Sequence, residues 1–321
     1  MNHFKTQAMT FDFIPQNTQM AMLGVVALLI SASLICFVLR QLQPHKDHQE
    51  LRLRINSWWL MVGVVFTALL VGKTASVIFF AFLSFLALKE FLSIVPIREP
   101  DRRVILWLYL AIPLNYYLVY IEWYGTFIIF VPVYLFLFIP FRMLLLGETK
   151  GFIRSAATYH WAAMTTIFSI SHIAYLLVLS SDVNPKGGAI GLVLYLGFLT
   201  QFNDVAQFIW GKIFGRHKII PNISPNKTWE GFVGGVITTV VAGCLLAEPL
   251  TPLTWQEGLL AGSIIGLAGF IGDLTMSAVK RDLNIKDTGN LIPGHGGILD
   301  RIDSLTYTAP LFFHFIYYLK Y

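Results

Sequence analysis

The residues that could do chemistry are concentrated in one polar run, Ser277–Asp303, in a chain that is otherwise mostly apolar. Because charged side chains are costly in lipid, so many of them together indicate a site that water can reach. The run contains cations, carboxylates and one His in a glycine-rich turn: Lys280, Arg281, Lys286 and Arg301; Asp282, Asp287, Asp300 and Asp303; and His295.

Asp273 lies just before this run and extends its chemistry. If one helix continues to Arg281, then Asp273, Ser277, Lys280 and Arg281 lie on one face of it. Mg²⁺ prefers one or two carboxylates and completes its coordination with water and substrate phosphates. We therefore predict Asp273 and Asp300 as metal ligands, with the cations of the run neutralising phosphate charge. The alternative is a solvated loop whose charges pair with one another.

A second polar stretch has the same character. Ser224, Lys227 and Thr228 precede a helix that is predicted to begin near Glu230, and phosphates favour helix N-termini. These residues are predicted to bind a nucleotide triphosphate. Asp204, at a helix end, is a further carboxylate near the metal or a ribose contact. The alternative is a connector whose Pro and Gly residues set turns.

The composition defines the class of protein. The chain has 321 residues, of which 56% are hydrophobic and 13% charged, against about 25% charged in soluble domains. Several uncharged runs reach about 18 residues, which is enough to cross a bilayer. We predict an all-α polytopic integral membrane protein with about ten transmembrane helices, and not a transmembrane barrel. The two cysteines lie inside apolar runs and indicate neither disulfides nor a metal motif.

The apolar runs predict the individual spans, and the seventh can run on past Asp204. We interpret the first as a retained helix, not a signal peptide. In order, the spans are Met20–Leu39, Trp58–Val71, Thr74–Val95, Val104–Ile121, Phe127–Leu146, Trp161–Ser180, Ala189–Phe202, Phe232–Ala247, Gly258–Met276 and Ser304–Leu319.

The Lys and Arg residues are concentrated in every second connection between the predicted spans. Of the 23 Lys and Arg residues, all but Lys5, Lys73, Lys186 and Lys320 fall in alternate connections. Lys and Arg mark the cytoplasmic side of a membrane protein, so these connections are predicted to face the cytoplasm and both termini to face away. The net charge of +5 then reflects topology and phosphate handling, and we predict no nucleic-acid partner. The basic connections are 40–57, 89–103, 142–160, 203–230 and 277–303.

Both polar stretches resemble the phosphatidate cytidylyltransferases (CDP-diacylglycerol synthases). The stretch Ser224–Gly231 is similar to the Ser-Pro-x-Lys-Thr-x-Glu-Gly motif of that family. The longer resemblance is to the family signature, here Ser277-x-x-Lys280-Arg281, Lys286-Asp287, Pro293-Gly294-His295-Gly296-Gly297 and Asp300-Arg301-x-Asp303.

The resemblance implies an activity and its partners. CMP would pass from CTP to phosphatidate, giving CDP-diacylglycerol and pyrophosphate in phospholipid biosynthesis. Mg²⁺ is implied, with a second, monovalent cation such as K⁺. The lipid would enter sideways from a bacterial inner membrane, with the active site facing the cytoplasm. Alternatives are another lipid phosphate, such as a polyprenyl or ether lipid, a transporter, or a non-catalytic scaffold.

The resemblance also implies roles for single residues. Asp303 or Asp204 would add a carboxylate to the metal site of Asp273 and Asp300. Gln207 departs from the family, in which an aromatic or small residue is expected. The remaining catalytic residues would be Ser277, Lys280, Arg281, Lys286, Asp287, His295 and Arg301, and the remaining substrate-binding residues Ser224, Lys227 and Thr228.

Because the two motifs lie in the C-terminal part of the chain, we predict two regions. These are divergent N-terminal transmembrane helices over 1–200 and a catalytic membrane region over 201–321.

Small residues recur at three- and four-residue steps in the ninth predicted span, which lets another helix approach closely. This spacing would hold Asp273 rigidly and would permit a homodimer. The residues are Gly262, Gly266, Gly269 and Gly272.

Overall fold

The computed structural model describes residues 14–43, 45, 47–294 and 296–321, and its regular structure is helical. Apart from two isolated bridging pairs, no β-structure occurs among these residues. The predicted all-α fold class is confirmed. The helices are α1 (Gln16–Leu42), α2 (Gln49–Val71), α3 (Lys73–Ile94), α4 (Arg102–Tyr120), α5 (Tyr124–Ile129), α6 (Phe136–Leu144), α7 (Phe152–Ala163), α8 (Ser169–Leu176), α9 (Gly188–Phe214), α10 (Trp229–Leu250), α11 (Trp255–Asp282), α12 (Leu299–Ile302) and α13 (Leu305–Lys320).

In the described part of the chain, 8 helical segments are long and apolar enough to cross a membrane. The other two predicted spans are helical as well. The sixth corresponds to α7 and α8, joined by a π-helical turn at Met164–Phe168. The tenth corresponds to α13, which has 16 residues. The polytopic membrane architecture is therefore confirmed.

Two helices are longer than the hydropathy alone predicts. Helix α2 begins at Gln49, within the predicted loop 40–57, where Arg54 and Glu50 form an ion pair one turn apart. Helix α9 continues past Asn203 to Phe214. The amide of Asn203 accepts from the Thr239 hydroxyl at 3.0 Å and donates to the Gly266 carbonyl at 3.2 Å, so this polar residue is satisfied inside the bundle.

Helices α9, α10, α11 and α13 pack together, and glycines permit close approach among them. A Cβ at Gly262 of α11 would lie 2.8 Å from the Cα of Val240 in α10, and one at Gly272 would lie 2.6 Å from the carbonyl oxygen of Asp303. The predicted role of the glycine spacing in close packing is confirmed. Gly272 brings the segment before α13 directly against α11, beside Asp273.

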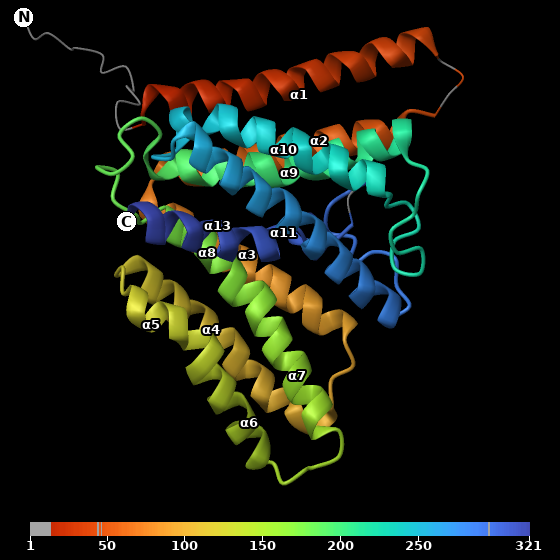
Figure 1. Cartoon of the computed structure of the whole chain (residues 1–321). Coiled ribbons are helices and arrows are strands. Elements are labelled where there is room, and N and C mark those ends of the chain that lie inside the picture. The colour runs from red at the N-terminus through yellow and green to blue at the C-terminus, as the bar shows by residue number, and fades with distance from the viewer. Residues whose placement is uncertain (1–13, 44, 46, 295) are drawn as a thin grey trace, which may run out of the picture.

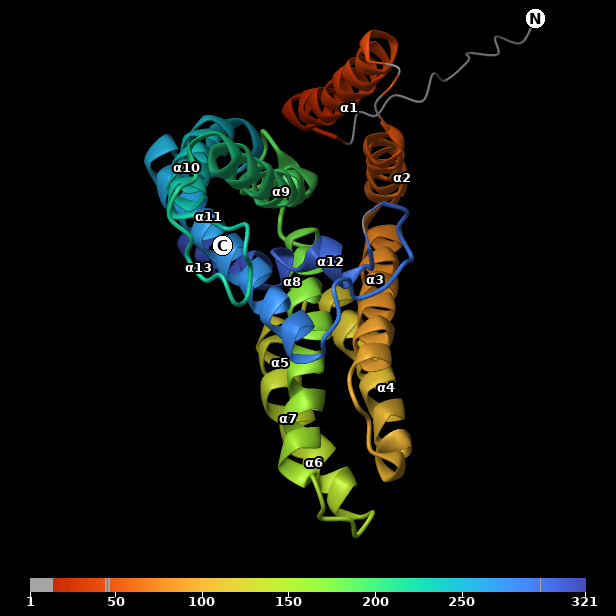
Figure 2. The ribbon, with the colours of Figure 1, turned by 90° about the vertical axis from the view of Figure 1, so that its right-hand side faces the viewer.

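Helices α3 to α7 form a second group, most of which lies below α9 and α10 in Figure 1, whereas α1 lies above them. Helix α8 packs against α3 and α4 and also against α13, and so links the two groups. Helix α1 contacts α2 and α9, but only 6% of its most apolar stretch is buried. The segment between α11 and α12 passes beside α2 and α3, far from them in sequence (Figure 2).

The five basic connections meet one another. Ser57 donates to the Pro293 carbonyl at 2.6 Å, which joins 40–57 to 277–303. Arg98 donates to the Lys150 carbonyl at 2.6 Å, which joins 89–103 to 142–160. Contacts of Glu90 and Arg281, described below, join 277–303 to 89–103 and to 203–230. The intervening connections make their own contacts, among them Asn17 with Pro249 and Lys320 with Glu257.

Candidate active site

Asp273 and Lys227 form an ion pair where two helix ends meet. Helix α11 carries Asp273 toward its C-terminal end, and the loop before α10 carries Lys227; their Oδ2 and Nζ atoms are 2.6 Å apart. Lys227 also donates to Oε1 of Gln207 at 3.0 Å and lies over the ring of Phe270. The two charged side chains are 23% and 21% exposed, so a polar ligand can reach them.

Two more carboxylates belong to this cluster. Asp204 of α9 accepts a hydrogen bond from the Ser304 hydroxyl at 2.9 Å, and its other oxygen is buried without a partner in the described structure. Burial raises the pKa of Asp303, and the negative charges of Asp273 and Asp204 raise it further. Three carboxylates with only Lys227 paired to one of them make a place that favours added positive charge.

Asp300 has different surroundings. Its Oδ1 accepts from Nζ of Lys280 at 2.7 Å, and its Oδ2 accepts from the amides of Thr288 and Gly297 at 2.9 and 3.0 Å and lies 2.9 Å from the Thr288 hydroxyl. Burial would raise the pKa of Asp300, but the hydrogen bond from Lys280 and those from the backbone amides outweigh burial, so its pKa is lowered. Asp300 therefore holds its loop to the end of α11.

Glu90 of α3 holds the same loop from the other side. It accepts from the Thr288 hydroxyl at 2.6 Å and from the amides of Ile298 and Leu299 at 2.8 and 2.9 Å. These contacts join distant parts of the chain, since Glu90 and Ile298 are separated by 208 positions. The N-terminal helices thus take part in building the loop between α11 and α12, residues 283–298, which we call the signature loop.

The residues that were predicted to bind the nucleotide lie around the start of α10. The Thr228 hydroxyl caps this helix by accepting from the Gly231 amide at 3.2 Å, and the residue is buried. Ser224 lies in the preceding turn, which is bound to α11 because Nε of Arg281 donates to the Ile223 carbonyl at 3.2 Å. These contacts fix the loop that carries Lys227, and they give Thr228 a structural role. The predicted substrate contacts of Ser224 and Thr228 stay predictions.

A polar cleft of about 530 Å³ lies between the signature loop and the first turns of α2. Lys286, Asp287 and Arg301 line it together with Glu50 and Arg54 of α2. Nε of Arg301 is buried and has no hydrogen-bond partner in the described structure. Arg301 therefore brings a guanidinium group with unused hydrogen-bonding capacity to the edge of the cleft, and such groups pair well with phosphate.

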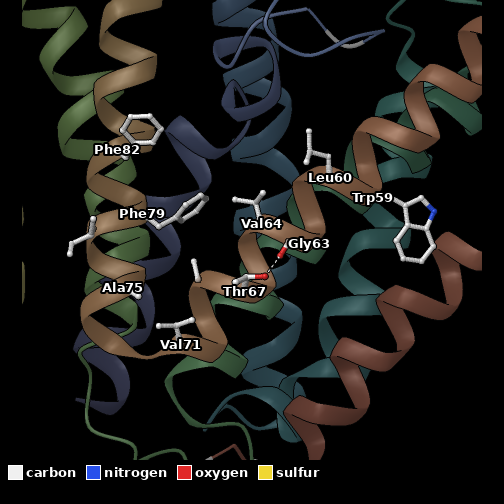
Figure 3. A pocket seen from close by; sticks show the side chains of 11 residues that line it. Trp59, Leu60, Gly63, Val64, Thr67, Val71, Ala75, Phe79 and Phe82 are labelled. Carbon is white, nitrogen blue, oxygen red and sulfur yellow. Dashed lines mark hydrogen bonds between the residues drawn. The ribbon is translucent and has the colours of Figure 1, made fainter.

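An apolar groove of about 770 Å³ separates α2 from α3 (Figure 3). In Figure 3, Leu60 and Val64 on α2 lie across the groove from Phe79 and Phe82 on α3. Leu60, Val64 and Phe82 are 64%, 46% and 55% exposed, so the groove opens to the outside of the protein. The signature loop contacts α2 at Ser57, close to one end of this groove.

The predicted site residues thus lie at the Lys227–Asp273 ion pair, in the loop that Asp300 holds, and along the polar cleft. Helix α11 continues to Asp282, so the condition that one helix reaches Arg281 is met, and it carries Asp273, Ser277, Lys280 and Arg281 in its last turns. His295 lies outside the described residues. Asp273 and Asp300 are paired with different lysines, and no group of three His, Cys, Asp or Glu side chains suited to a metal was found in the described part. Their joint role as ligands stays a prediction.

Glu90 and Gln207 are site residues that the sequence analysis missed or misread. Glu90 had a signal, because a carboxylate within a predicted membrane span is a candidate functional residue by default. Gln207, noted only as a departure from the family, accepts from Lys227. Thr288, whose amide and hydroxyl bind Asp300, carries no signal in sequence.

Comparisons with known proteins agree with these features. The chain is 45% identical over 296 residues, 92% of its length and 97% of the relative, to the uncharacterized protein YnbB of Escherichia coli (strain K12). It is 42% identical over 161 residues to the phosphatidate cytidylyltransferase of Mycobacterium leprae (strain TN), and 35% identical over 156 residues to that of Staphylococcus haemolyticus (strain JCSC1435). These matches span 49% and 58% of the two relatives.

A family model extends the likeness beyond the signature. The model of the cytidylyltransferase family matches residues 52–319, which includes α2 to α8 as well as the C-terminal helices. The resemblance recognised from the two polar stretches is confirmed, and so is the class of enzyme, a CTP-dependent nucleotidyltransferase. The chain belongs to the cytidylyltransferase family.

Proposed function

We propose that this protein transfers CMP from CTP to a lipid phosphate, with phosphatidate as the acceptor, and releases pyrophosphate. The observation that carries the proposal is the ion pair of Lys227 with Asp273, beside Asp204 and Asp303. Cations and carboxylates at the ends of membrane helices can bind a nucleotide triphosphate where a lipid phosphate can also arrive.

The chemistry needs positioning more than a strong base. A lipid phosphate monoester is largely dianionic at neutral pH, since its second pKa is about 6. One of its oxygens attacks the α-phosphorus of CTP, the bond from that phosphorus to the β-phosphate oxygen breaks, and pyrophosphate leaves. The protein must hold the two phosphates in line and neutralise their charge. Lys227, Lys280 and Arg281 supply positive charge at the ends of α10 and α11.

The carboxylate cluster fits Mg²⁺. Asp204 has a buried oxygen without a partner, and Asp273 is partly exposed beside it. A magnesium ion that keeps waters and substrate phosphates needs only one or two protein carboxylates. We propose that Asp273 holds the ion with Asp204 or Asp303, while Asp300 supports the loop. When bound, Mg²⁺ would neutralise the triphosphate; a monovalent cation beside it is an expectation from the family resemblance only.

The acceptor lipid would bind in the polar cleft and in the apolar groove. The cleft offers Lys286, Arg301 and Arg54 to a phosphate, and the groove between α2 and α3 opens toward lipid next to it. We propose that one acyl chain of the acceptor lies in this groove. Its phosphate would then approach the signature loop from the membrane, without leaving the bilayer.

The membrane orientation is also part of the proposal. The basic connections contact one another, and Lys and Arg are retained on the cytoplasmic side of bacterial membranes. We therefore place the site at the cytoplasmic face of an inner membrane, where CTP is available.

The test is an assay of purified protein in nanodiscs with labelled CTP and a panel of lipid phosphates. Phosphatidate, a polyprenyl phosphate and an ether-lipid phosphate are supplied separately, with Mg²⁺ and then with EDTA. We expect a CDP-lipid and equimolar pyrophosphate, loss of both with EDTA, and at least a 100-fold lower rate for Asp273→Asn. Absence of pyrophosphate release with every lipid would overturn the proposal, and lipid flux without CTP would favour a transporter.

A further inference from the structure

The carboxylate of Glu90 joins the two ends of the signature loop. One end is Thr288, whose hydroxyl lies 2.6 Å from Oε1. The other end is the start of α12, where the Leu299 amide donates to Oε1 at 2.9 Å and the Ile298 amide to Oε2 at 2.8 Å. The segment between these ends contains His295 in sequence and lines the polar cleft.

Two glycines allow this arrangement. A Cβ built on Gly297 would lie 2.1 Å from Oε1 of Glu90, and one built on Gly289 would lie 3.1 Å from Oε2. A side chain at Gly297 would therefore displace the carboxylate. The missing Cβ of Gly297 therefore leaves the space that the carboxylate occupies, and Gly289 lets the other side of the loop approach it closely.

The same contacts reach the other charged residues of the loop. The Thr288 hydroxyl lies within hydrogen-bond distance of both Glu90 and Asp300, at 2.6 and 2.9 Å. Asp300 in turn accepts from Lys280 at 2.7 Å. A continuous set of hydrogen bonds thus connects α3 to the C-terminal turn of α11, the helix that carries Asp273.

We infer that Glu90, in the N-terminal half of the chain, is the positioning residue that holds the signature loop against the catalytic helix α11, an inference that rests on the proposed function. Glu90 acts by fixing Thr288, Ile298 and Leu299, and through them the place of Asp300 and the cleft residues.

Glu90→Gln is the sharpest substitution. The amide keeps one accepting oxygen, but its NH₂ group would face the backbone N–H of Ile298 or that of Leu299, so one hydrogen bond is replaced by two donors that oppose each other. A small misplacement of catalytic groups can reduce a rate by about 100-fold. We expect kcat for CDP-lipid formation to fall about 10- to 100-fold, with KM for CTP changed less than about threefold.

Gly297→Ala approaches the same contact from the loop, because its Cβ would displace the Glu90 carboxylate. If the two residues act together, the double variant should be no slower than the slower single variant, within about twofold. Glu99→Gln is the matched control, since Glu99 is an exposed carboxylate a short distance further along the chain. Its kcat should stay within about twofold of the original.

Amide hydrogen exchange gives a readout that does not depend on the reaction. In Glu90→Gln the amides between Thr288 and Leu299 should exchange at least tenfold faster, while those of α9 and α10 stay protected. Unchanged exchange, or faster exchange with unchanged kcat, would overturn the inference; so would loss of protection throughout the protein. If the original protein makes no CDP-lipid, the proposed function fails, and the exchange experiment still decides whether Glu90 holds the loop.

Discussion

Asp300 accepts hydrogen bonds at both of its oxygens, whereas Asp273 shares its carboxylate between Lys227 and solvent. The sequence predicted the same role, metal ligand, for both residues, and their surroundings in the fold are what distinguish them. Asp300 is 5% exposed and accepts hydrogen bonds from the protein at both oxygens, so we expect it to contribute to stability. Asp273 remains open to a cation or a phosphate.

Asp300→Asn should therefore lower the stability, by about 3–5 kcal/mol for removal of one partner of a buried ion pair. The pKa of Asp300 is lower in the folded protein than the unfolded value of about 3.9. Its contribution is present above about pH 4 and is lost as the pH falls through the folded pKa. Thermal unfolding in detergent between pH 7 and pH 3 checks this.

The matched control for that experiment is Asp282→Asn, an exposed carboxylate at the end of the same helix. The gap in melting temperature between the original and Asp300→Asn should be wide at pH 7 and narrow toward pH 3. A gap that stays constant with pH would show that the charge of Asp300 is not what stabilises the loop.

At this scale the sequence was informative about residue types and poor about partners. Clustered charges in an apolar chain predicted where polar chemistry lies, because lipid excludes them elsewhere. The partners of Asp273 and Asp300 could not be predicted, since several lysines stand at comparable distances in sequence. Thr228 illustrates the same limit, because a hydroxyl before a helix suits a phosphate and a helix cap equally well.

Helix α11 is the element on which the site depends. The helix begins with a capping box formed by Thr254 and Glu257. In its last turns, Asp273 pairs with Lys227, Lys280 pairs with Asp300, and Arg281 donates to the Ile223 carbonyl. The glycine face in between lets neighbouring elements approach closely. Close packing of this kind is a main source of helix association in membranes, where apolar side chains gain little by leaving lipid.

Gly272→Ala should destabilise the packing of α11, although the substitution adds only one methyl group. The added Cβ would lie 2.6 Å from the Asp303 carbonyl oxygen and 3.0 Å from the Cα of Ser304, both backbone atoms. We expect a loss of about 1–3 kcal/mol, as for other overpacked cores, together with reduced CDP-lipid formation. Unfolding in detergent and the nanodisc assay measure the two effects.

Gly197→Ala in α9 is the control, because a Cβ there meets nothing within 4 Å. It should leave stability and rate unchanged or slightly improved, since Ala favours helix over Gly. Equal effects of the two substitutions would mean that helix propensity, and not the approach of Asp303, explains the result. The spacing of the glycines predicted a close contact, but not which element fills it.

The molecule as a whole joins its two predicted regions at the signature loop. Ser57 of α2 and Glu90 of α3 contact this loop across 236 and 208 positions of chain. Hydropathy predicted the helices well because length and apolarity suffice to identify a span. It could not predict which spans are neighbours, because a helix face that contacts lipid and one that contacts protein are both apolar.

Gly63→Leu tests the proposed acyl-chain groove at this scale. Gly63 lines the groove, and a Cβ there meets nothing within 4 Å, so the new side chain can enter the open space. We expect kcat/KM to fall about tenfold for a lipid phosphate with long acyl chains and less than twofold for a short-chain analogue. An assay over a series of chain lengths with saturating CTP provides the measurement.

Gly24→Leu in α1 is the matched control, an exposed glycine of another spanning helix with equally free space. It should not change the preference for chain length. If Gly63→Leu affects long and short chains equally, the groove is not where the acyl chain lies, although the transfer reaction itself would be unaffected by that result.

The contacts of Glu90 also bear on how the protein is made. Synthesis runs from the N-terminus, so this carboxylate is inserted with α3 long before Ile298 and Leu299 leave the ribosome. Until they arrive, water must serve as its partner at the membrane surface. A nascent chain stopped before α12 would be threaded through the bilayer and still lack a finished pocket, which makes assembly of that pocket one of the last steps in biogenesis.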